Sequence, residues 1–227
     1  CMVMVGGLNV SPTFAAAASD VPVLGGLFQI LTVRNYDAED GQVNQHVSVP
    51  EVDAKGDLAQ QVNAEIQERV DAHLAQAQQV WEDYHDAFIA TGGTEDEWSQ
   101  REMNVDVNYE IKSQTDTTVS FVVTMTQDMF DAYNEQTYYN LDIAADKDIT
   151  LADVLGEDWV NICNAAVQTY IDQDTTGLFF SADEGGFTTV DEATSFYLNE
   201  DGSVTLVFPE YTIAAGAAGI VEIPVAG

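Results

Sequence analysis

Three aspartates near residue 180 have the spacing of a calcium-binding loop. Asp172, Asp174 and Asp183 hold positions one, three and twelve of the stretch "DQDTTGLFFSAD", and Gly177 holds position six. Calcium loops take oxygen ligands at such positions and need glycine where the backbone turns sharply. Two positions depart from the pattern, because Thr176 stands at position five and aspartate at position twelve is shorter than the usual bidentate glutamate. Calcium is therefore a candidate ligand, and an acidic loop after a helix is the favoured alternative.

The sequence contains no arrangement of side chains that is typical of an enzyme active site. His46, His73 and His85 form no pair with metal-ligand spacing. One Glu-x-x-His motif is present at Glu82 and His85, whereas a di-iron bundle needs two on facing helices. A nucleophile elbow and a phosphate-binding loop are both missing from the sequence. We therefore expect a protein that is not an enzyme and has no cofactor apart from the calcium candidate.

The net charge narrows the range of partners. The chain has 39 acidic and 6 basic residues, which gives a formal net charge of -33. Nucleic-acid binding is excluded, because it requires basic side chains that neutralise phosphates. The same charge opposes docking on an anionic membrane surface. A basic partner would be attracted by long-range steering, although a solvated surface suited to a salty or extracellular setting is the favoured explanation.

The two cysteines do not suggest a disulfide. Cys1 and Cys163 lie far apart, and no cysteine spacing typical of a metal site occurs. Cys163 lies at helical spacing with apolar neighbours, so we expect a buried thiol. Those neighbours are Trp159, Ala166, Val167 and Tyr170.

Residues 57–90 carry the longest periodic signal in the chain. Apolar residues recur there every three or four positions, which predicts a long amphipathic helix that ends before Gly92 and Gly93. The stripe consists of Leu58, Val62, Ile66, Val70, Leu74, Ala77, Trp81, Tyr84 and Phe88. Such a stripe must cover a flat apolar surface, and a sheet is its natural partner.

Alternating apolar and polar residues predict strands on both sides of this helix. The expected strands cover residues 27–36, 42–52, 104–114, 118–127 and 136–146. Strands with one buried and one solvated face are typical of antiparallel sheets. A second helix is expected from about Leu151, followed by a hairpin over 194–213 and an apolar run over 219–225. These elements predict an α+β fold, an antiparallel sheet with the long helix and a second helix packed on one face.

The first residues are expected to lie outside the folded domain. Residues 1–8 are apolar, but Asn9 and Pro12 end the run well short of the ~20 residues of a spanning helix. We expect residues 1–20 to be a membrane-exit and linker segment. A single domain then covers 21–227, with the long helix in 21–145 and the second helix and hairpin in 146–227.

Three stretches together resemble a known family. They are "LNVSPTFAAAASDVPVLGGLFQILTVRNY", "YYNLDIAADKDITLADVLGED" and "FYLNEDGSVTLVFPEYTIAAGAAGIVEIPV". The chain resembles the extracellular domain of the lysozyme-sensing, RsiV-type anti-sigma factors of Gram-positive bacteria. The last stretch carries the most specific motif, formed by Phe208, Tyr211, Ile213, Ala214, Gly216, Gly219, Ile223 and Pro224. The long helix and the central strands agree with the family only in order and pattern.

The resemblance implies a non-catalytic sensor on the outer face of the bacterial cytoplasmic membrane, anchored by a single membrane-spanning helix. A cytoplasmic segment, outside this sequence, would bind a sigma factor. Binding of a basic protein such as lysozyme would expose a site for signal peptidase and begin regulated proteolysis. No short motif marks the residues that contact lysozyme in the family.

The alanine run is the candidate processing site. Ala15 and Ala17, or Ala16 and Ala18, provide the small residues two positions apart that signal peptidase requires, just after an apolar run. An ordinary helical linker is the alternative, because alanine is also a good helix former.

Other functions stay open at this point. The closing motif is also shared with PdaC-like cell-envelope proteins of unknown function, so an accessory domain that binds wall glycan or protein without signalling is the second hypothesis. Cys1 would be acylated in a lipoprotein if a lipobox preceded it, and a secreted protein is a further alternative. A hydrolase is the third and least favoured hypothesis, because no catalytic arrangement supports it.

Overall fold

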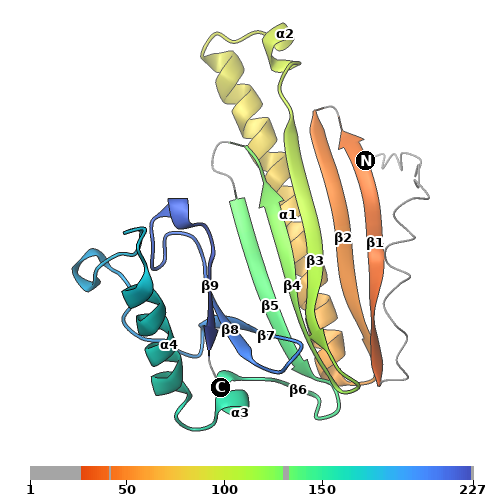
Figure 1. Cartoon of the computed structure of the whole chain (residues 1–227). Coiled ribbons are helices and arrows are strands. Elements are labelled where there is room, and N and C mark those ends of the chain that lie inside the picture. The colour runs from red at the N-terminus through yellow and green to blue at the C-terminus, as the bar shows by residue number, and fades with distance from the viewer. Residues whose placement is uncertain (1–26, 41, 130–132, 226–227) are drawn as a thin grey trace. The chain divides into compact units, whose positions relative to one another are not determined.

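The computed structural model describes residues 27–40, 42–129 and 133–225 and has an α+β fold (Figure 1). One sheet has the strand order β1-β2-β3-β4-β5-β6, and the other has the order β7-β8-β9. The larger sheet consists of β1 (Phe28–Asp40), β2 (Val43–Ala54), β3 (Met103–Gln114), β4 (Thr118–Gln127), β5 (Tyr133–Asp142) and β6 (Lys147–Asp148). The smaller sheet consists of β7 (Ser195–Leu198), β8 (Val204–Phe208) and β9 (Val221–Val225). The helices are α1 (Asp57–Ala90), α2 (Glu95–Trp98), α3 (Leu151–Leu155), α4 (Trp159–Gln173), η2 (Ala182–Glu184) and η3 (Gly216–Ala218).

The chain forms two compact units. The first unit contains the described residues up to Tyr109 together with Val123–Gln136. The second unit contains Glu110–Val122 and the described part of Thr137–Gly227. Strands β3, β4 and β5 therefore contribute residues to both units. None of the helices in the described ranges has both the length and the apolar character needed to cross a membrane.

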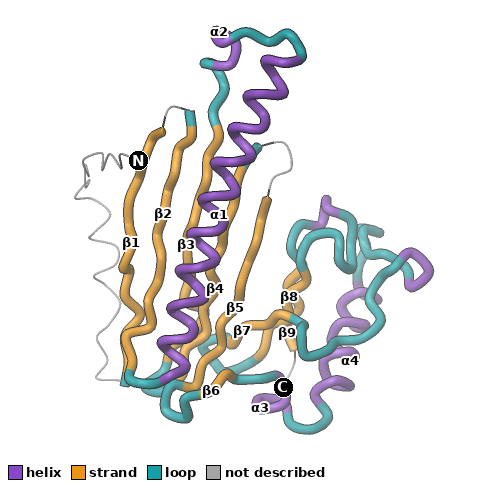
Figure 2. Tube along the Cα trace, turned by 180° about the vertical axis from the view of Figure 1, so that it is seen from behind, coloured by secondary structure: helices purple, strands orange, loops and turns teal. Residues whose placement is uncertain are grey.

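The long helix of the first unit is confirmed with the predicted bounds. Helix α1 spans Asp57–Ala90 and lies lengthwise against one face of the sheet (Figure 2). Its apolar stripe faces the strands, so that Ile66 and Val70 are 1% and 0% exposed. On the sheet, Val47 and Val105 are equally buried. The driving force is the removal of apolar surface from water, at roughly 25 cal/mol per Å².

The prediction of an entirely antiparallel sheet is wrong at one pairing. Strands β2 and β3 are parallel, with Val43 opposite Met103 and Val47 opposite Val107. Parallel neighbours need a crossover connection, and α1 provides it by carrying the chain back along the sheet. Alternation of apolar and polar residues showed that one face is covered, but it did not report the direction of the neighbouring strand.

Aromatic side chains close the end of α1. The Trp98 ring of α2 lies 4.5 Å from the ring of Trp81 and 5.0 Å from that of Tyr84, measured between centroids. The guanidinium of Arg101 lies 4.5 Å from the centroid of Phe88, a cation–π contact. The buried Nε of Arg101 has no hydrogen-bond partner. The aromatic rings therefore provide the principal environment of this cation.

A histidine is buried between α1 and the strands of the first unit. His73 is 6% exposed, and its Nε2 lies 3.3 Å from the carbonyl oxygen of Thr126 on β4. Desolvation is the largest influence and lowers the pKa of His73, against the opposing effects of the Thr126 carbonyl and the Glu135 carboxylate. Burial thus favours the neutral imidazole.

The free energy of unfolding is expected to decrease between about pH 7 and 5 in a way that depends on His73. Because the folded pKa lies below the unfolded value of about 6.5, the stabilisation is present above that value and is lost as the pH falls through the folded pKa. The change His73→Gln keeps an N–H donor but removes the titration, so urea unfolding at each pH should give a flatter profile for this variant.

His46 provides a control of opposite sign. A hydrogen bond to Asp37 raises the pKa of His46, so its contribution is present below about pH 6.5 and is lost as the pH rises through the folded pKa. We expect only a small effect of His46→Gln, because the His46 side chain is 55% exposed. Identical pH profiles for wild type and His73→Gln would contradict the assignment to His73.

The second unit has its own core, formed by α3, α4 and the smaller sheet. Cys163 and Val167 of α4 and Leu206 of β8 are completely buried. The predicted buried thiol is confirmed, and burial raises the pKa of Cys163 to about 11. Tyr170, which shares the helical spacing of Cys163, is 42% exposed and packs edge-on against Phe179.

The predicted second helix is divided into two. Helix α3 ends at Leu155, and Gly156 follows with a φ of 80°, a left-handed conformation that glycine adopts without strain. Helix α4 then begins at Trp159. The predicted hairpin is confirmed, since β7 and β8 are antiparallel and the turn closes with the N–H of Asn199 donating to the carbonyl of Ser203.

A buried polar network joins β4, β5 and β7 within the second unit. The Ser120 hydroxyl donates to Oδ1 of Asn140 at 2.6 Å and accepts from the N–H of Leu198 at 3.0 Å. Nδ2 of Asn140 donates to the carbonyl of Phe196 at 2.9 Å. Ser120 and Val122 were expected on a solvated face, yet they are 0% and 3% exposed. This part of β4 is therefore covered on both faces.

Candidate functional site

The structure does not bring the calcium candidates together as a metal site. Across the ranges that the structure describes, no group of three His, Cys, Asp or Glu side chains is placed to hold a metal ion. Asp174 instead accepts hydrogen bonds from the N–H and hydroxyl of Thr176 and from the N–H of Gly177, which lower the pKa of its carboxyl. Asp172 lies in the last turn of α4, and Asp183 lies in η2. Calcium binding by this loop stays a prediction.

The processing candidates Ala15, Ala16, Ala17 and Ala18 lie outside the described residues, as does Cys1. Their roles stay predictions.

The loop between β8 and β9 presents the most exposed large apolar side chain of the described residues. Tyr211 is 72% exposed. Its φ is 64°, a left-handed conformation that is uncommon for a residue other than glycine and that often marks a functional site. The turn is closed by Thr212, whose N–H and hydroxyl both donate to the carbonyl of Pro209. Tyr211 is thus held outward by a defined turn.

The base of this loop is anchored on the core of the second unit. Ile213 and Ala214, which follow Tyr211, are 5% and 2% exposed. The N–H of Phe180 donates to the carbonyl of Ile213 at 3.0 Å, and the N–H of Ala215 donates to the carbonyl of Leu178 at 2.8 Å. A rigid base below an exposed aromatic ring reduces the conformational entropy that is lost on binding.

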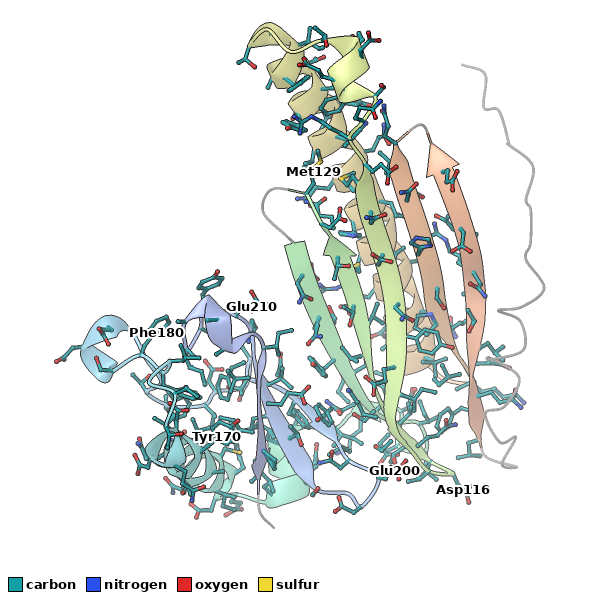
Figure 3. All side chains as sticks on the ribbon, turned by 45° about the horizontal axis from the view of Figure 1, so that its top comes forward. Asp116, Met129, Tyr170, Phe180, Glu200 and Glu210 are labelled. Carbon is teal, nitrogen blue, oxygen red and sulfur yellow. The ribbon has the colours of Figure 1, made fainter. Side chains whose placement is uncertain are left out.

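Gly216 allows the ring of Tyr211 to take its place. A Cβ atom at this position would overlap the outer ring atoms and the hydroxyl of Tyr211. Exposed Glu210 precedes the tyrosine and is labelled in Figure 3 in the loop after β8. The loop therefore offers an aromatic anchor beside a carboxylate, a combination suited to a protein partner with basic side chains.

The Glu-x-x-His motif at Glu82 and His85 lies in a hollow of the first unit. This hollow has a volume of about 550 Å³, and Glu82, His85, Asp86 and Glu95 are among the residues that line it. Nε2 of His85 lies 3.2 Å from a carboxylate oxygen of Glu95. Glu82 is exposed and His85 is partly exposed, so the motif lies on the polar side of α1.

The family model described as "Protein of unknown function (DUF3298)" matches residues 47–226. The chain belongs to the DUF3298 family. The match begins within β2 and continues through β9, so it includes the Tyr211 loop.

The chain is also similar to an anti-sigma factor. The anti-sigma-V factor RsiV of Bacillus subtilis (strain 168) is 21% identical over 223 residues, which cover 95% of this chain and 74% of RsiV. The predicted resemblance to an RsiV-type anti-sigma factor is therefore confirmed.

A solved structure of a DUF3298 family member shows the same fold. A DUF3298 family member from Bacteroides fragilis NCTC 9343 has a TM-score of 0.59 at 13% identity, with 88% of this chain and 90% of that chain covered. A second, from Pseudomonas aeruginosa PAO1, has a TM-score of 0.44 at 15% identity, with 88% of each chain covered.

Sequence reasoning placed Tyr211 in the most specific motif of the DUF3298 domain but gave it no role. A tyrosine two residues after Pro209 and five before Gly216 was the available signal. Its exposure and its left-handed backbone became evident only from the structure.

Proposed function

We propose that this DUF3298 domain is the extracellular sensor of a membrane-anchored anti-sigma factor. The observation that carries the proposal is the similarity to RsiV over 95% of the chain. The domain acts by binding and not by catalysis. The sigma factor would be bound by a cytoplasmic segment outside this sequence, so the domain would communicate with it through the membrane anchor.

The proposed ligand is a basic protein of the lysozyme type. The formal net charge of -33 favours such a ligand by attracting it over a long range and accelerating encounter. Tyr211, beside Glu210, is the proposed contact point, because an exposed aromatic side chain on a rigid base is typical of the residues that dominate binding energy.

Calorimetric titration of the domain with a C-type lysozyme at moderate salt tests this proposal. We expect saturable binding with a Kd in about the micromolar range or tighter, weakened by added salt. An acidic protein of similar size should give no binding signal. Absence of lysozyme binding at micromolar protein concentrations would refute the ligand proposal.

Ligand binding is proposed to expose the alanine run to signal peptidase. We expect that replacing Ala16 and Ala18 with tyrosine in the membrane-anchored protein blocks ligand-dependent cleavage, because the small pockets of the peptidase reject bulky side chains. Cleavage can be followed by immunoblotting with and without lysozyme. If only the alternate pair is used, Ala15→Tyr with Ala17→Tyr blocks cleavage instead. Normal processing of both double variants would remove this step.

A further inference from the structure

The second unit contains a hollow of its own, and the residues that line it differ from those of the Tyr211 loop. Its volume is about 550 Å³, within the range of about 300–1,000 Å³ that is typical of small-molecule sites. It is lined by the ends of β5 and β6, the starts of α3 and α4, and the segment that leads into β7. Aromatic side chains from three of these elements contribute to the lining: Tyr138, Tyr139, Trp159 and Phe196.

The floor of this hollow is rigid. Tyr139, Asn140 and Phe196 are 6%, 7% and 9% exposed. Both ends of the Asn140 amide are engaged in the buried network with Ser120 and the carbonyl of Phe196. The ring of Tyr139 stacks on that of Phe121 at a centroid distance of 5.0 Å. A ligand would therefore enter a site whose shape is formed before binding.

Several polar groups in the lining are available to a ligand. The hydroxyl of Ser195, the indole N–H of Trp159 and the carboxylates of Asp148 and Glu192 have no hydrogen bond or ion pair with other described residues. The neighbouring hydroxyl of Thr150, in contrast, is used in the capping box of α3 with Asp153. The free groups comprise two donors and two acceptors, which is the small polar set that orients a ligand in an otherwise apolar site.

The chemistry of the lining excludes one class of ligand and favours another. Lys, Arg and His do not occur among the lining residues, whereas Asp148 and Glu192 do, so phosphates and other anions are disfavoured. Carboxylates accept hydrogen bonds from hydroxyl groups, and aromatic faces pack against C–H groups. A sugar ring presents both, with hydroxyl groups at its rim and C–H groups on its faces.

We propose that this hollow binds a neutral carbohydrate, with one sugar ring packed against Trp159 and its hydroxyl groups donating to Asp148 and Glu192. The hydroxyl of Ser195 and the indole N–H of Trp159 donate hydrogen bonds to oxygen atoms of the sugar. This site is additional to the lysozyme contact and does not depend on it, since every lining residue differs from those of the Tyr211 loop.

Nuclear magnetic resonance of the tryptophan indole N–H groups tests the proposal. The chain has three tryptophans, and Trp159 lines this hollow, whereas Trp81 and Trp98 belong to the first unit. Titration with N-acetylchitotetraose, cellotetraose and maltotetraose should shift the Trp159 signal, assigned with Trp159→Phe, in a saturable way at about millimolar concentration or below. The three sugars distinguish an amino-sugar chain from two kinds of glucan.

Blocking the hollow provides a matched comparison. Ala193 is exposed and lines the hollow, whereas Ala165 is exposed on α4 and does not line it. We expect Ala193→Phe to reduce the sugar-induced shift at least tenfold and Ala165→Phe to leave it unchanged. Glu192→Gln should weaken binding without changing the fold, because its side chain is exposed.

Three outcomes would overturn the proposal: no Trp159 shift with any of the sugars, equal responses of the two phenylalanine variants, or a shift produced by spermidine but not by sugars. Lysozyme titration of Ala193→Phe should remain normal, so failure of the carbohydrate proposal and failure of the sensor proposal give different results.

Discussion

Tyr211→Ala is expected to weaken lysozyme binding roughly 30-fold or more, which corresponds to about 2 kcal/mol. Exposed aromatic residues on a rigid base are typical binding hot spots, since they bury a large area and lose little conformational entropy. Because Tyr211 is 72% exposed, its truncation should not lower the thermal unfolding midpoint. Glycine adopts a positive φ without strain. The variant Tyr211→Gly therefore removes the side chain and also relieves the backbone strain at this position. Calorimetry gives the affinity, and circular dichroism gives the midpoint.

Tyr170→Ala is the matched control. Tyr170 is another exposed tyrosine of the same unit, labelled on α4 in Figure 3. Its replacement should leave lysozyme affinity within about twofold, because it lies on a different element. Gly216→Ala should weaken binding to an intermediate degree, since the added methyl group displaces the Tyr211 ring without removing it. If Tyr211→Ala and Tyr170→Ala bind lysozyme alike, the Tyr211 loop is not the contact.

Asn140→Leu is expected to destabilise the protein by about 2–4 kcal/mol. The change leaves the Ser120 hydroxyl without its acceptor and the Phe196 carbonyl without its donor. Each buried polar group that loses its partner costs about 1–3 kcal/mol. The lost amide cannot be replaced by water without opening the buried network, because Ser120 and Asn140 are 0% and 7% exposed. The free energy of unfolding, obtained from urea titration at pH 7, measures the effect.

A double-mutant cycle separates the network from simple loss of volume. Ser120→Ala removes the acceptor of the Leu198 N–H and the donor to Asn140, and the double variant Ser120→Ala with Asn140→Leu should cost less than the sum of the two single changes. Asn108→Leu is the control in a strand, since Asn108 is exposed and should change stability by less than about 0.5 kcal/mol. Additive effects in the cycle would show that Ser120 and Asn140 are not coupled.

Much of the fold could be predicted because its elements carry strong local signals. The bounds of α1 follow from an apolar stripe that continues without interruption and from the glycines after it. The buried residues of β5 and its following turn, Tyr139, Leu141 and Ile143, follow from alternation in the same way. Elements whose type and burial depend on their own residues are visible in a single sequence.

The pairing of elements could not be predicted in the same way. The parallel pairing of β2 with β3 is a consequence of the crossover through α1, which local periodicity does not report. Similarly, Val122 and Ser120 are buried because the second face of β4 is covered, and alternation on β4 itself assumes that this face is solvated. Strand direction and the covering of a second face both depend on neighbouring elements, which the residues of a single strand do not specify.

The candidate functional residues also depend on tertiary structure, which a local sequence pattern does not report. The aspartate spacing from Asp172 to Asp183 approximates that of a calcium loop, and in the structure Asp174 accepts the hydrogen bonds of a turn at Thr176. In a chain with 39 acidic residues such spacings arise readily, so an acidic motif has little specificity here. The hollow beside Trp159 combines residues from 138 to 196, which no local pattern connects.

The parallel pairing of β2 and β3 also determines the order in which the first unit can assemble. Hairpin β1–β2 and helix α1 involve neighbours in sequence, whereas Val43 meets Met103 only across the whole of α1. Closing a loop of that length as flexible chain is entropically costly, and a helix already formed replaces it with a stiff spacer. A chain that is synthesised from its N-terminus therefore has the hairpin and the helix available before β3 is made, and this strand completes the sheet on a surface that is already formed.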